Sequence, residues 1–287
     1  MKVLGLVCSY RKMGNTEIAV KEALMGAQEA GAEVAMVRLT DYRIEPCRGC
    51  MSCVFKKVPC PIQDEAHALY STLVEYDALI LGTPTYILGP TGLLKTLLDR
   101  GMGFMYGYGR GLEGRPAISI ATAGIPGWEP YALPMNALFL RALGYTIVDQ
   151  FMVYGQGPGE AIYHEDAIKR SRKGGKTIVE QLSRGKVEYT GEAPPYSCPY
   201  CHNTLLLFLD GGKVKCPNCG IEGNLKAEGQ DYRVEWEETP DRWAEKEVIL
   251  HFEHQVLPSG PRFMQRKKEI REKTAHYRQF SPPSPKK

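Results

Sequence analysis

The feature that most constrains the fold is a regular alternation of short apolar runs with longer amphipathic segments in the first 183 residues. The apolar runs are rich in Val, Ile and Leu and hardly alternate with polar residues, as strands buried on both faces of a sheet do. We therefore expect an α/β protein with a doubly wound, five-stranded parallel sheet. Strands are expected at 2–8, 33–39, 77–83, 115–122 and 145–153, and helices near 15–30, 64–75, 90–100, 128–143 and 164–182.

The character of the chain changes after Gly185. Residues 186–197 contain Gly191, Pro194 and Pro195, a composition typical of a linker. The remainder holds a compact segment with four cysteines and then a charged stretch. We expect four parts: an α/β domain over 1–185, a linker over 186–197, a small cysteine-bearing unit over 198–223 and a charged extension over 224–287.

Composition narrows the classes of partner. The net charge is +3 and 43% of the residues are hydrophobic, which favours a packed core and makes nucleic-acid or membrane binding unlikely as a main role. No secretory signal and no apolar run of membrane-spanning length are recognisable, so we expect a cytoplasmic protein. The basic stretch 262–278 is interpreted as a solvated helix face, with a contact surface for a partner or RNA as the alternative.

The first strand ends in a turn whose residue types suit a phosphate group. A helix that begins near Asn15 points free backbone N–H groups and the positive end of its dipole at this turn. An ordinary capped turn is the alternative, since Asn and Thr are common caps. The turn is neither a dinucleotide loop nor a Walker loop. The polar, basic and glycine residues concerned are Ser9, Arg11, Lys12, Gly14, Asn15 and Thr16.

The third strand leads into the run Pro84-Thr85-Tyr86-Ile87-Leu88-Gly89, followed by Gly92-Leu93-Leu94-Lys95 and Asp99-Arg100. A proline-rich loop with an aromatic side chain offers backbone dipoles and a ring face to a flat ligand, although Tyr86 could also serve packing alone. Together the two loops resemble the NADPH-dependent FMN reductase branch of the flavodoxin superfamily. The resemblance covers about 1–180.

The resemblance implies a flavodoxin-like fold and an FMN cofactor. Its phosphate would lie on 9–16, its ring system against 84–89, and a third contact would follow the fourth strand. The cofactor-binding residues that this implies are Ser9, Arg11, Lys12, Gly14, Asn15, Thr16, Pro84, Thr85, Tyr86, Ile87, Leu88, Gly89, Thr122, Ala123 and Gly124. No side chain is assigned a catalytic role.

Eight of the nine cysteines fall into two groups, which in a cytosolic chain usually indicates metal binding. The first group is Cys47, Cys50, Cys53 and Cys60, with the spacing C-x2-C-x2-C-x6-C and a proline after the last cysteine. Three thiolates at such short intervals favour an iron–sulfur cluster over zinc, which tends to use two separated pairs. Zinc and metal-free thiols are the alternatives. The ninth cysteine, Cys8, is interpreted as a small buried hydrophobe.

In a flavodoxin-like chain, this run resembles the iron–sulfur flavoproteins of anaerobes. That family implies a 4Fe–4S cluster on these four cysteines that exchanges electrons with FMN, in a homo-oligomer that is a dimer or a tetramer. It implies a ferredoxin-like donor or NAD(P)H and leaves the acceptor open. A non-enzymatic redox sensor or adaptor that binds a partner through its C-terminal unit is the alternative function.

The second group is Cys198, Cys201, Cys216 and Cys219. The two Cys-x2-Cys pairs flank a predicted hairpin with strands at 204–209 and 213–215 and a turn at 210–212, which is typical of a zinc ribbon. A rubredoxin-like mononuclear iron site has the same ligands and stays an alternative. His202 is expected to be a surface residue and not a further ligand.

Overall fold

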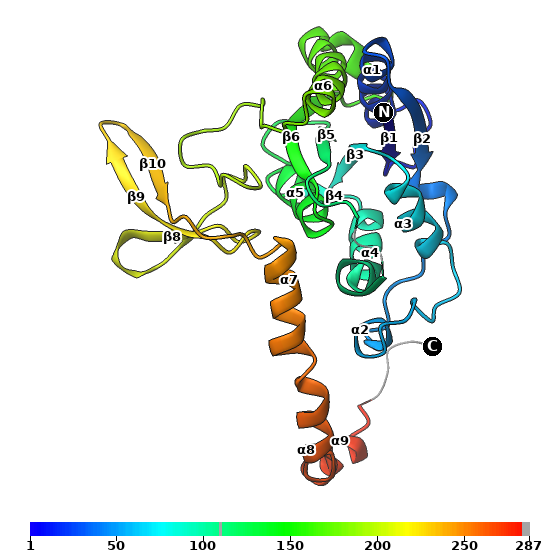
Figure 1. Ribbon diagram of the computed structural model, residues 1–287, viewed down its shortest axis with the longest axis vertical. Helices are drawn as coiled ribbons and strands as arrows, with labels where there is room; N and C mark the ends of the chain where they lie inside the picture. Colours follow the sequence, from blue (N-terminus) through cyan, green and yellow to red (C-terminus); the bar gives the residue numbers. More distant parts are fainter. Residues whose placement is uncertain (109–110, 283–287) are drawn as a thin grey trace.

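The computed structural model describes residues 1–108 and 111–282. Its main sheet confirms the prediction of a five-stranded parallel α/β architecture, with strand order β2-β1-β3-β5-β6 (Figure 1). The order reverses beside β1, because β2 lies on one side of it and β3 on the other. The five strands are β1 (Lys2–Val7), β2 (Glu33–Arg38), β3 (Ala78–Tyr86), β5 (Pro116–Ala123) and β6 (Thr146–Tyr154).

Alternate residues of each strand enter two separate cores. In β1, Val3 and Val7 join the core beneath α1 (Asn15–Glu29) and α6 (Glu165–Arg184). Leu4 and Leu6 join the core on the opposite face, beneath the remaining helices of the domain. The strands are therefore buried on both faces, which explains why their sequences read as continuous apolar runs. The helices on that opposite face are α3 (Ala66–Val74), α4 (Gly92–Arg100) and α5 (Ala132–Ala142).

Two glycines allow α1 and α6 to pack with their backbones in contact. A Cβ at Gly26 would lie 1.9 Å from the carbonyl oxygen of Arg172, and one at Gly175 would lie 1.8 Å from that of Ala23. Larger side chains at these positions would push the helices apart.

The third strand is longer than predicted and ends in a hairpin. β3 continues to Tyr86 and pairs antiparallel with β4 (Gly89–Pro90), which places Ile87 and Leu88 in the tight turn between them. Both have positive φ, 45° and 67°, a conformation that usually favours glycine. Helix α5 also begins four residues later than predicted, so Trp128 lies in the preceding loop with 66% of its surface exposed.

The C-terminal third forms a second, antiparallel sheet of order β10-β9-β8-β7. The predicted hairpin is present as β7 (Leu207–Phe208) and β8 (Lys213–Lys215), separated by a short 3-10 turn, Asp210–Gly212. Two further strands, β9 (Glu222–Glu228) and β10 (Asp231–Trp236), extend this sheet past residue 223. The linker lies along the edge of the main sheet, where the amide of Thr190 donates to the carbonyl of Val148 at 2.7 Å.

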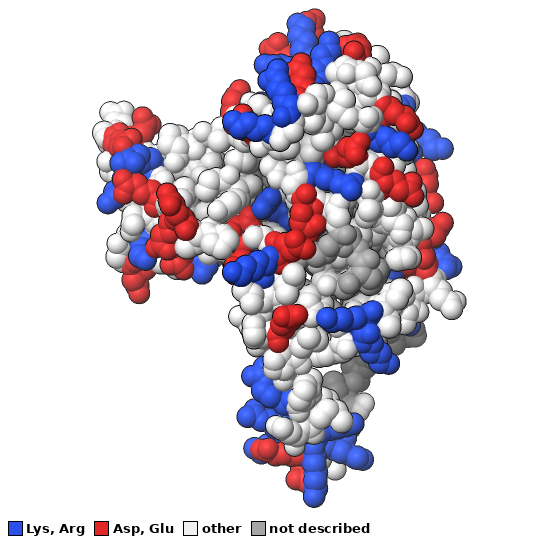
Figure 2. Space-filling view, viewed as in Figure 1, with Lys and Arg blue, Asp and Glu red and all other residues white. Residues whose placement is uncertain are grey.

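The chain ends in a helical arm that projects from the body of the molecule (Figure 1). It consists of α7 (Glu245–His251), a π-helical turn Phe252–Val256, α8 (Ser259–Lys273) and α9 (Ala275–Gln279). Neither α8 nor α9 has a buried residue, which agrees with the interpretation of 262–278 as a solvated helix face. Basic side chains gather on this end of the molecule (Figure 2). None of the helices in the described ranges combines the length and apolarity needed to cross a bilayer.

Candidate functional site

A cleft opens at the carboxyl ends of the parallel strands, where the strand order reverses. Ligands of doubly wound folds bind at this position, because the loops after β1 and β3 diverge there. The cleft has a volume of about 260 Å³. Eleven of the fifteen predicted cofactor residues line it: Ser9, Arg11, Gly14, Asn15, Thr16, Pro84, Thr85, Tyr86, Thr122, Ala123 and Gly124.

The turn after β1 is rigid and partly buried. Helix α1 begins at Asn15, so the backbone N–H groups of its first turn have no partner within the helix. Beneath the turn, Glu17 and Arg38 form a buried ion pair, and Arg38 also donates to the carbonyl of Ser9 at 2.9 Å. Burial alone would raise the pKa of Glu17, but hydrogen bonds from Lys21 and from the Met13 amide hold it below its ordinary value. These contacts fix the loop before any ligand binds.

Two predicted phosphate ligands have a different role in the structure. The side-chain amide of Asn15 donates to the carbonyls of Gly155 and Gly157 at 2.8 and 3.1 Å, and its oxygen accepts from the amide of Ala161 at 3.0 Å. The hydroxyl of Thr16 lies 2.7 Å from that of Thr122 in a buried contact. Asn15 therefore ties the loop after β6 to the turn, and Thr16 ties the end of β5 to it. With their side chains occupied, these two residues offer a ligand their backbone amides.

Four predicted residues do not line the cleft, and two unpredicted ones do. Lys12 is exposed beside it, Ile87 is 96% exposed at the tip of the hairpin, and Leu88 and Gly89 face the loop before α5. The added lining residues are Gly155 and Gln156, which directly follow β6. Their position at the end of the fifth predicted strand was the available signal, because the carboxyl ends of parallel strands meet at one edge.

One buried polar atom without a partner indicates that the cleft suits a ligand such as a flavin nucleotide. The hydroxyl oxygen of Thr85 is buried and has no hydrogen-bond partner among the described residues, although Thr85 lines the cleft. Buried polar groups in native proteins are usually satisfied, so a ligand atom is the expected partner. The donor amides of α1, the basic Arg11 and the aromatic Tyr86 match the phosphate and the ring system of such a ligand.

The first cysteine group lies on a loop that is fastened at its neck. Arg100, at the end of α4, donates to the carbonyl of Glu45 at 2.7 Å and pairs with Asp64, whose carboxylate also accepts from the Glu45 amide at 2.8 Å. The side chains of Arg100 and Asp64 are each about 1% exposed. Burial alone would lower the pKa of Arg100, but its contacts with Asp64 and Cys60 raise it. A permanent positive charge therefore lies beside Cys60.

The cysteines of this loop are near one another but not crowded. Cys47 and Cys50 are exposed, and Cys53 and Cys60 are half-buried. Burial raises the pKa of Cys53, and repulsion from Cys60, Cys50 and Cys47 adds to the effect. Within the described ranges, no three of these four sulfurs lie within 4.8 Å of one another. Among the described residues, these four thiols are therefore not gathered into a single-ion arrangement as the second group is.

The helical arm packs on the same loop. The short helix α2 (Ser52–Phe55) contains Val54, whose side chain is fully buried in a small cluster with Tyr106, Val248 and Phe252. The rings of Tyr106 and Phe252 stack with their centroids 4.4 Å apart. The apolar anchor of the first cysteine loop is thus supplied largely by residues near the other end of the chain.

The second cysteine group is compact and buried. The sulfurs of Cys198, Cys201, Cys216 and Cys219 all lie within 4.8 Å of one another, and the sulfurs of Cys201 and Cys216 are 3.5 Å apart. Hydrogen bonds from the neighbouring thiols lower the pKa of Cys216, which favours its thiolate form. These four residues could hold a single metal ion in the tetrahedral sulfur geometry of a zinc ribbon.

Each Cys-x2-Cys pair is formed by the same backbone turn. The amide of His202 donates to the carbonyl of Cys198, and that of Gly220 donates to the carbonyl of Cys216, both at 2.9 Å. Both donors have positive φ, 54° for His202 and 78° for Gly220. His202 is not among the four gathered ligands, and it is more buried than predicted: it is half-buried and stacks on Tyr189 with ring centroids 3.5 Å apart. Burial lowers its pKa to about 4.

Comparison with known proteins agrees with this geometry. Residues 1–153 match the family described as NADPH-dependent FMN reductase. An iron–sulfur flavoprotein of Archaeoglobus fulgidus is 34% identical over 193 residues, 67% of this chain and 86% of that protein. A flavone synthase of Aspergillus candidus is 28% identical over 259 residues, 78% of this chain and 77% of that protein.

A solved structure of a flavone reductase shares the fold of the whole chain. Its TM-score is 0.81 at 21% identity, and the superposition covers 100% of both chains. The C-terminal unit and the arm therefore belong to a fold that also occurs elsewhere. With a family match over more than half of its length, this chain belongs to the NADPH-dependent FMN reductase family, has iron–sulfur flavoproteins among its relatives and carries an additional four-cysteine unit.

Proposed function

We propose that this protein is an FMN-dependent oxidoreductase that passes electrons between FMN and a 4Fe–4S cluster on the first cysteine loop. The observation that carries the proposal is the cleft at the strand ends, which combines eleven predicted residues with the unpartnered hydroxyl of Thr85. Bound FMN can hold two electrons whereas a cluster passes one at a time, so the pair would convert between the two regimes.

The chain's own residues would bind and orient the flavin. Arg11 and the first backbone amides of α1 would hold the phosphate, and Gly14 lets the backbone approach it. Tyr86 and the backbone of Pro84 and Thr85 would lie against the ring system. The backbone at Gly124 and Gly155 would close the third side, held in place by the contacts of Asn15 and Thr16.

The cluster would be held by Cys47, Cys50, Cys53 and Cys60. The short intervals between the first three cysteines and the proline after the fourth support this assignment, because ferredoxin-type clusters are held by such runs. Arg100 would offset part of the negative charge beside Cys60. A ferredoxin-like protein or NAD(P)H would supply electrons to a cytoplasmic homo-oligomer, and the C-terminal site would hold zinc, with iron as the alternative.

A second candidate concerns the acceptor. The flavone synthase aligns with 259 residues, beyond the 193 that align with the archaeal iron–sulfur flavoprotein. This longer alignment supports a small organic acceptor of flavonoid type, whose carbon–carbon double bond next to a carbonyl would gain two electrons and two protons. A redox sensor without turnover remains the non-enzymatic alternative.

The test is anaerobic purification followed by measurement of FMN, iron, acid-labile sulfide and zinc per chain. We expect one FMN, four iron, about four sulfide and one zinc. Thr85→Val should weaken FMN retention, whereas Thr72→Val, at a half-buried position on α3 that does not line the cleft, should not. Steady reduction of an added acceptor would support the enzyme, and redox-dependent partner binding without turnover would support the sensor. Protein that retains neither flavin nor sulfide would refute the proposal.

A further inference from the structure

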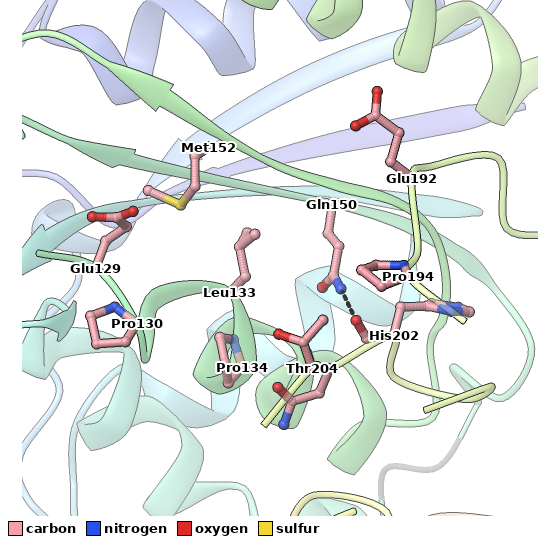
Figure 3. A pocket seen from close by; sticks show the side chains of 11 residues that line it. Glu129, Pro130, Leu133, Pro134, Gln150, Met152, Glu192, Pro194, His202 and Thr204 are labelled. Atoms are coloured by element: carbon pink, nitrogen blue, oxygen red, sulfur yellow. Dashed lines mark hydrogen bonds between the residues drawn. The ribbon is translucent and has the colours of Figure 1, made fainter. Parts of the chain in front are cut away.

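A second cavity, separate from the cofactor cleft, lies between α5, β6 and the four-cysteine unit (Figure 3). Its volume is about 220 Å³. Glu129 and Leu133 contribute one wall, Gln150 and Met152 of β6 a second, and Asn203 of the four-cysteine unit a third. Three parts of the chain that are far apart in sequence thus meet around one space.

Gln150 presents an unused hydrogen-bond acceptor at this cavity. Its side chain is 9% exposed, and its amide nitrogen donates to the carbonyls of His202 and Cys201 at 3.0 and 3.3 Å. These two bonds fix the orientation of the amide. Its oxygen therefore faces away from them and has no partner among the described residues.

Asn203 presents the complementary donor. It is 3% exposed, and its side-chain oxygen accepts from the amide of Leu205 at 3.0 Å, which again fixes the orientation. Its nitrogen has no partner within the described ranges. Glu129 adds a second acceptor: one carboxylate oxygen accepts from the hydroxyl of Tyr154 at 2.9 Å, and the other is buried and unpartnered.

Three unsatisfied buried polar atoms around one space are unusual in a native protein, and they define the chemistry of an occupant. An acceptor requires a donor such as a hydroxyl group, and the donor of Asn203 requires an acceptor such as a carbonyl; a water molecule can satisfy the second acceptor. Leu133, Met152 and proline rings supply apolar walls for a flat body. A cavity of about 150 Å³ can hold benzene, so this one has room for one substituted ring. The carboxylates of Glu129 and Glu192 disfavour an anion.

We propose that this cavity binds a neutral aromatic ketone with a ring hydroxyl group. A dinucleotide does not suit it, because the space is too small and its lining carries acidic side chains and no Lys or Arg. Tyr154, the partner of Glu129, immediately precedes Gly155 of the cofactor cleft, so the two sites are neighbours. The assignment of this site to the electron acceptor rests on the proposed function, whereas the binding itself does not.

The test is titration calorimetry at pH 7 with 4-hydroxyacetophenone as the probe, on the full-length protein with its cofactors. We expect saturable 1:1 binding that falls at least about tenfold in Gln150→Leu, which removes a buried acceptor. Leu133→Trp should fill the cavity without removing a hydrogen bond and should abolish binding. Thr177→Val, in a separate groove on α6, is the matched control and should bind as the unmodified protein does.

Two related probes test the polar assignments. Acetophenone lacks the hydroxyl, and 4-hydroxybenzoate carries a negative charge, so both should bind at least about tenfold more weakly. No saturable binding, or equal binding to Leu133→Trp, would mean a water-filled cavity only and would overturn the proposal. Flavin content and flavin reduction are measured on the same samples, so the failure of this site is distinguishable from the failure of the proposed function.

Discussion

The two cysteine groups differ in their burial, in how closely their sulfurs are gathered and in which residues hold them. The group at 198–219 is buried, crowded within 4.8 Å and built on two matching turns, so its geometry is set by its own backbone. The group at 47–60 is exposed or half-buried, is not gathered within 4.8 Å and is held by residues from elsewhere in the chain: Arg100 at its neck and Phe252 beneath α2. We therefore expect a metal on the group at 198–219 to stabilise the fold of its own unit, whereas the group at 47–60 depends on the fold of the rest of the chain.

The largest effect should come from removing one ligand of each group. Cys216→Ser should release the single metal ion and unfold the sheet β7–β10, because the metal contributes on the order of 10 kcal/mol to units of this kind. Cys53→Ser should remove acid-labile sulfide and leave the thermal transition of the α/β domain in place. Metal analysis and hydrogen exchange check both.

Cys8→Ala is the matched control, since Cys8 is buried in the α/β core and belongs to neither group. It should retain both metal contents. The difference between the two groups would be contradicted if Cys53→Ser unfolds the α/β domain. It would also be contradicted if the sheet β7–β10 stays protected from hydrogen exchange in Cys216→Ser.

A smaller effect should follow from cutting the apolar support of the first loop. Phe252→Ala removes a nearly buried ring stacked on Tyr106, at a cost of up to about 3 kcal/mol. The thiols at 47–60 should then react faster with an alkylating reagent in the metal-free protein. Phe263→Ala, on the exposed α8, should leave the rate unchanged. Equal rates for both variants would show that the arm does not stabilise the loop.

The smallest effect should be a pH dependence of local stability around the cysteines at 47–60, without a matching effect around those at 198–219. Burial alone would raise the pKa of Asp64, but hydrogen bonds from Arg100 and from the Glu45 and Ala66 amides lower it. Its stabilising contribution is therefore complete above the ordinary carboxyl pKa of about 3.9 and is lost as the pH falls through the lower folded value. Hydrogen exchange of residues 43–66 should accelerate in that acid range.

Asp64→Asn should accelerate this exchange already at neutral pH and flatten its acid dependence. If the acid dependence persists in Asp64→Asn, another group is responsible. The exchange of residues 198–219 is the internal reference for both measurements.

The sequence predicted the doubly wound parallel sheet and the position of the cleft. Strands that are buried on both faces appear as apolar runs, and the loops at their carboxyl ends appear as turn residues between those runs. Apolar runs and turn residues were sufficient to locate β1, β3 and β5 within a few residues. The side chain of Asn15 could not be predicted in the same way, since its bonds to Gly155, Gly157 and Ala161 join positions about 140 residues apart. The hairpin of β3 with β4 was missed because Ile87 and Leu88 do not resemble turn residues.

The packing of Phe252 on α2 has a consequence for biosynthesis. Val248 follows Val54 by 194 residues. At ribosomal speeds of about 5–20 residues per second, the first cysteine loop is synthesised roughly ten to forty seconds before the residues that anchor it. During that interval α2 lacks the apolar support of Val248 and Phe252, so Cys47, Cys50, Cys53 and Cys60 would meet cellular assembly factors on a loop that is not yet anchored by the arm.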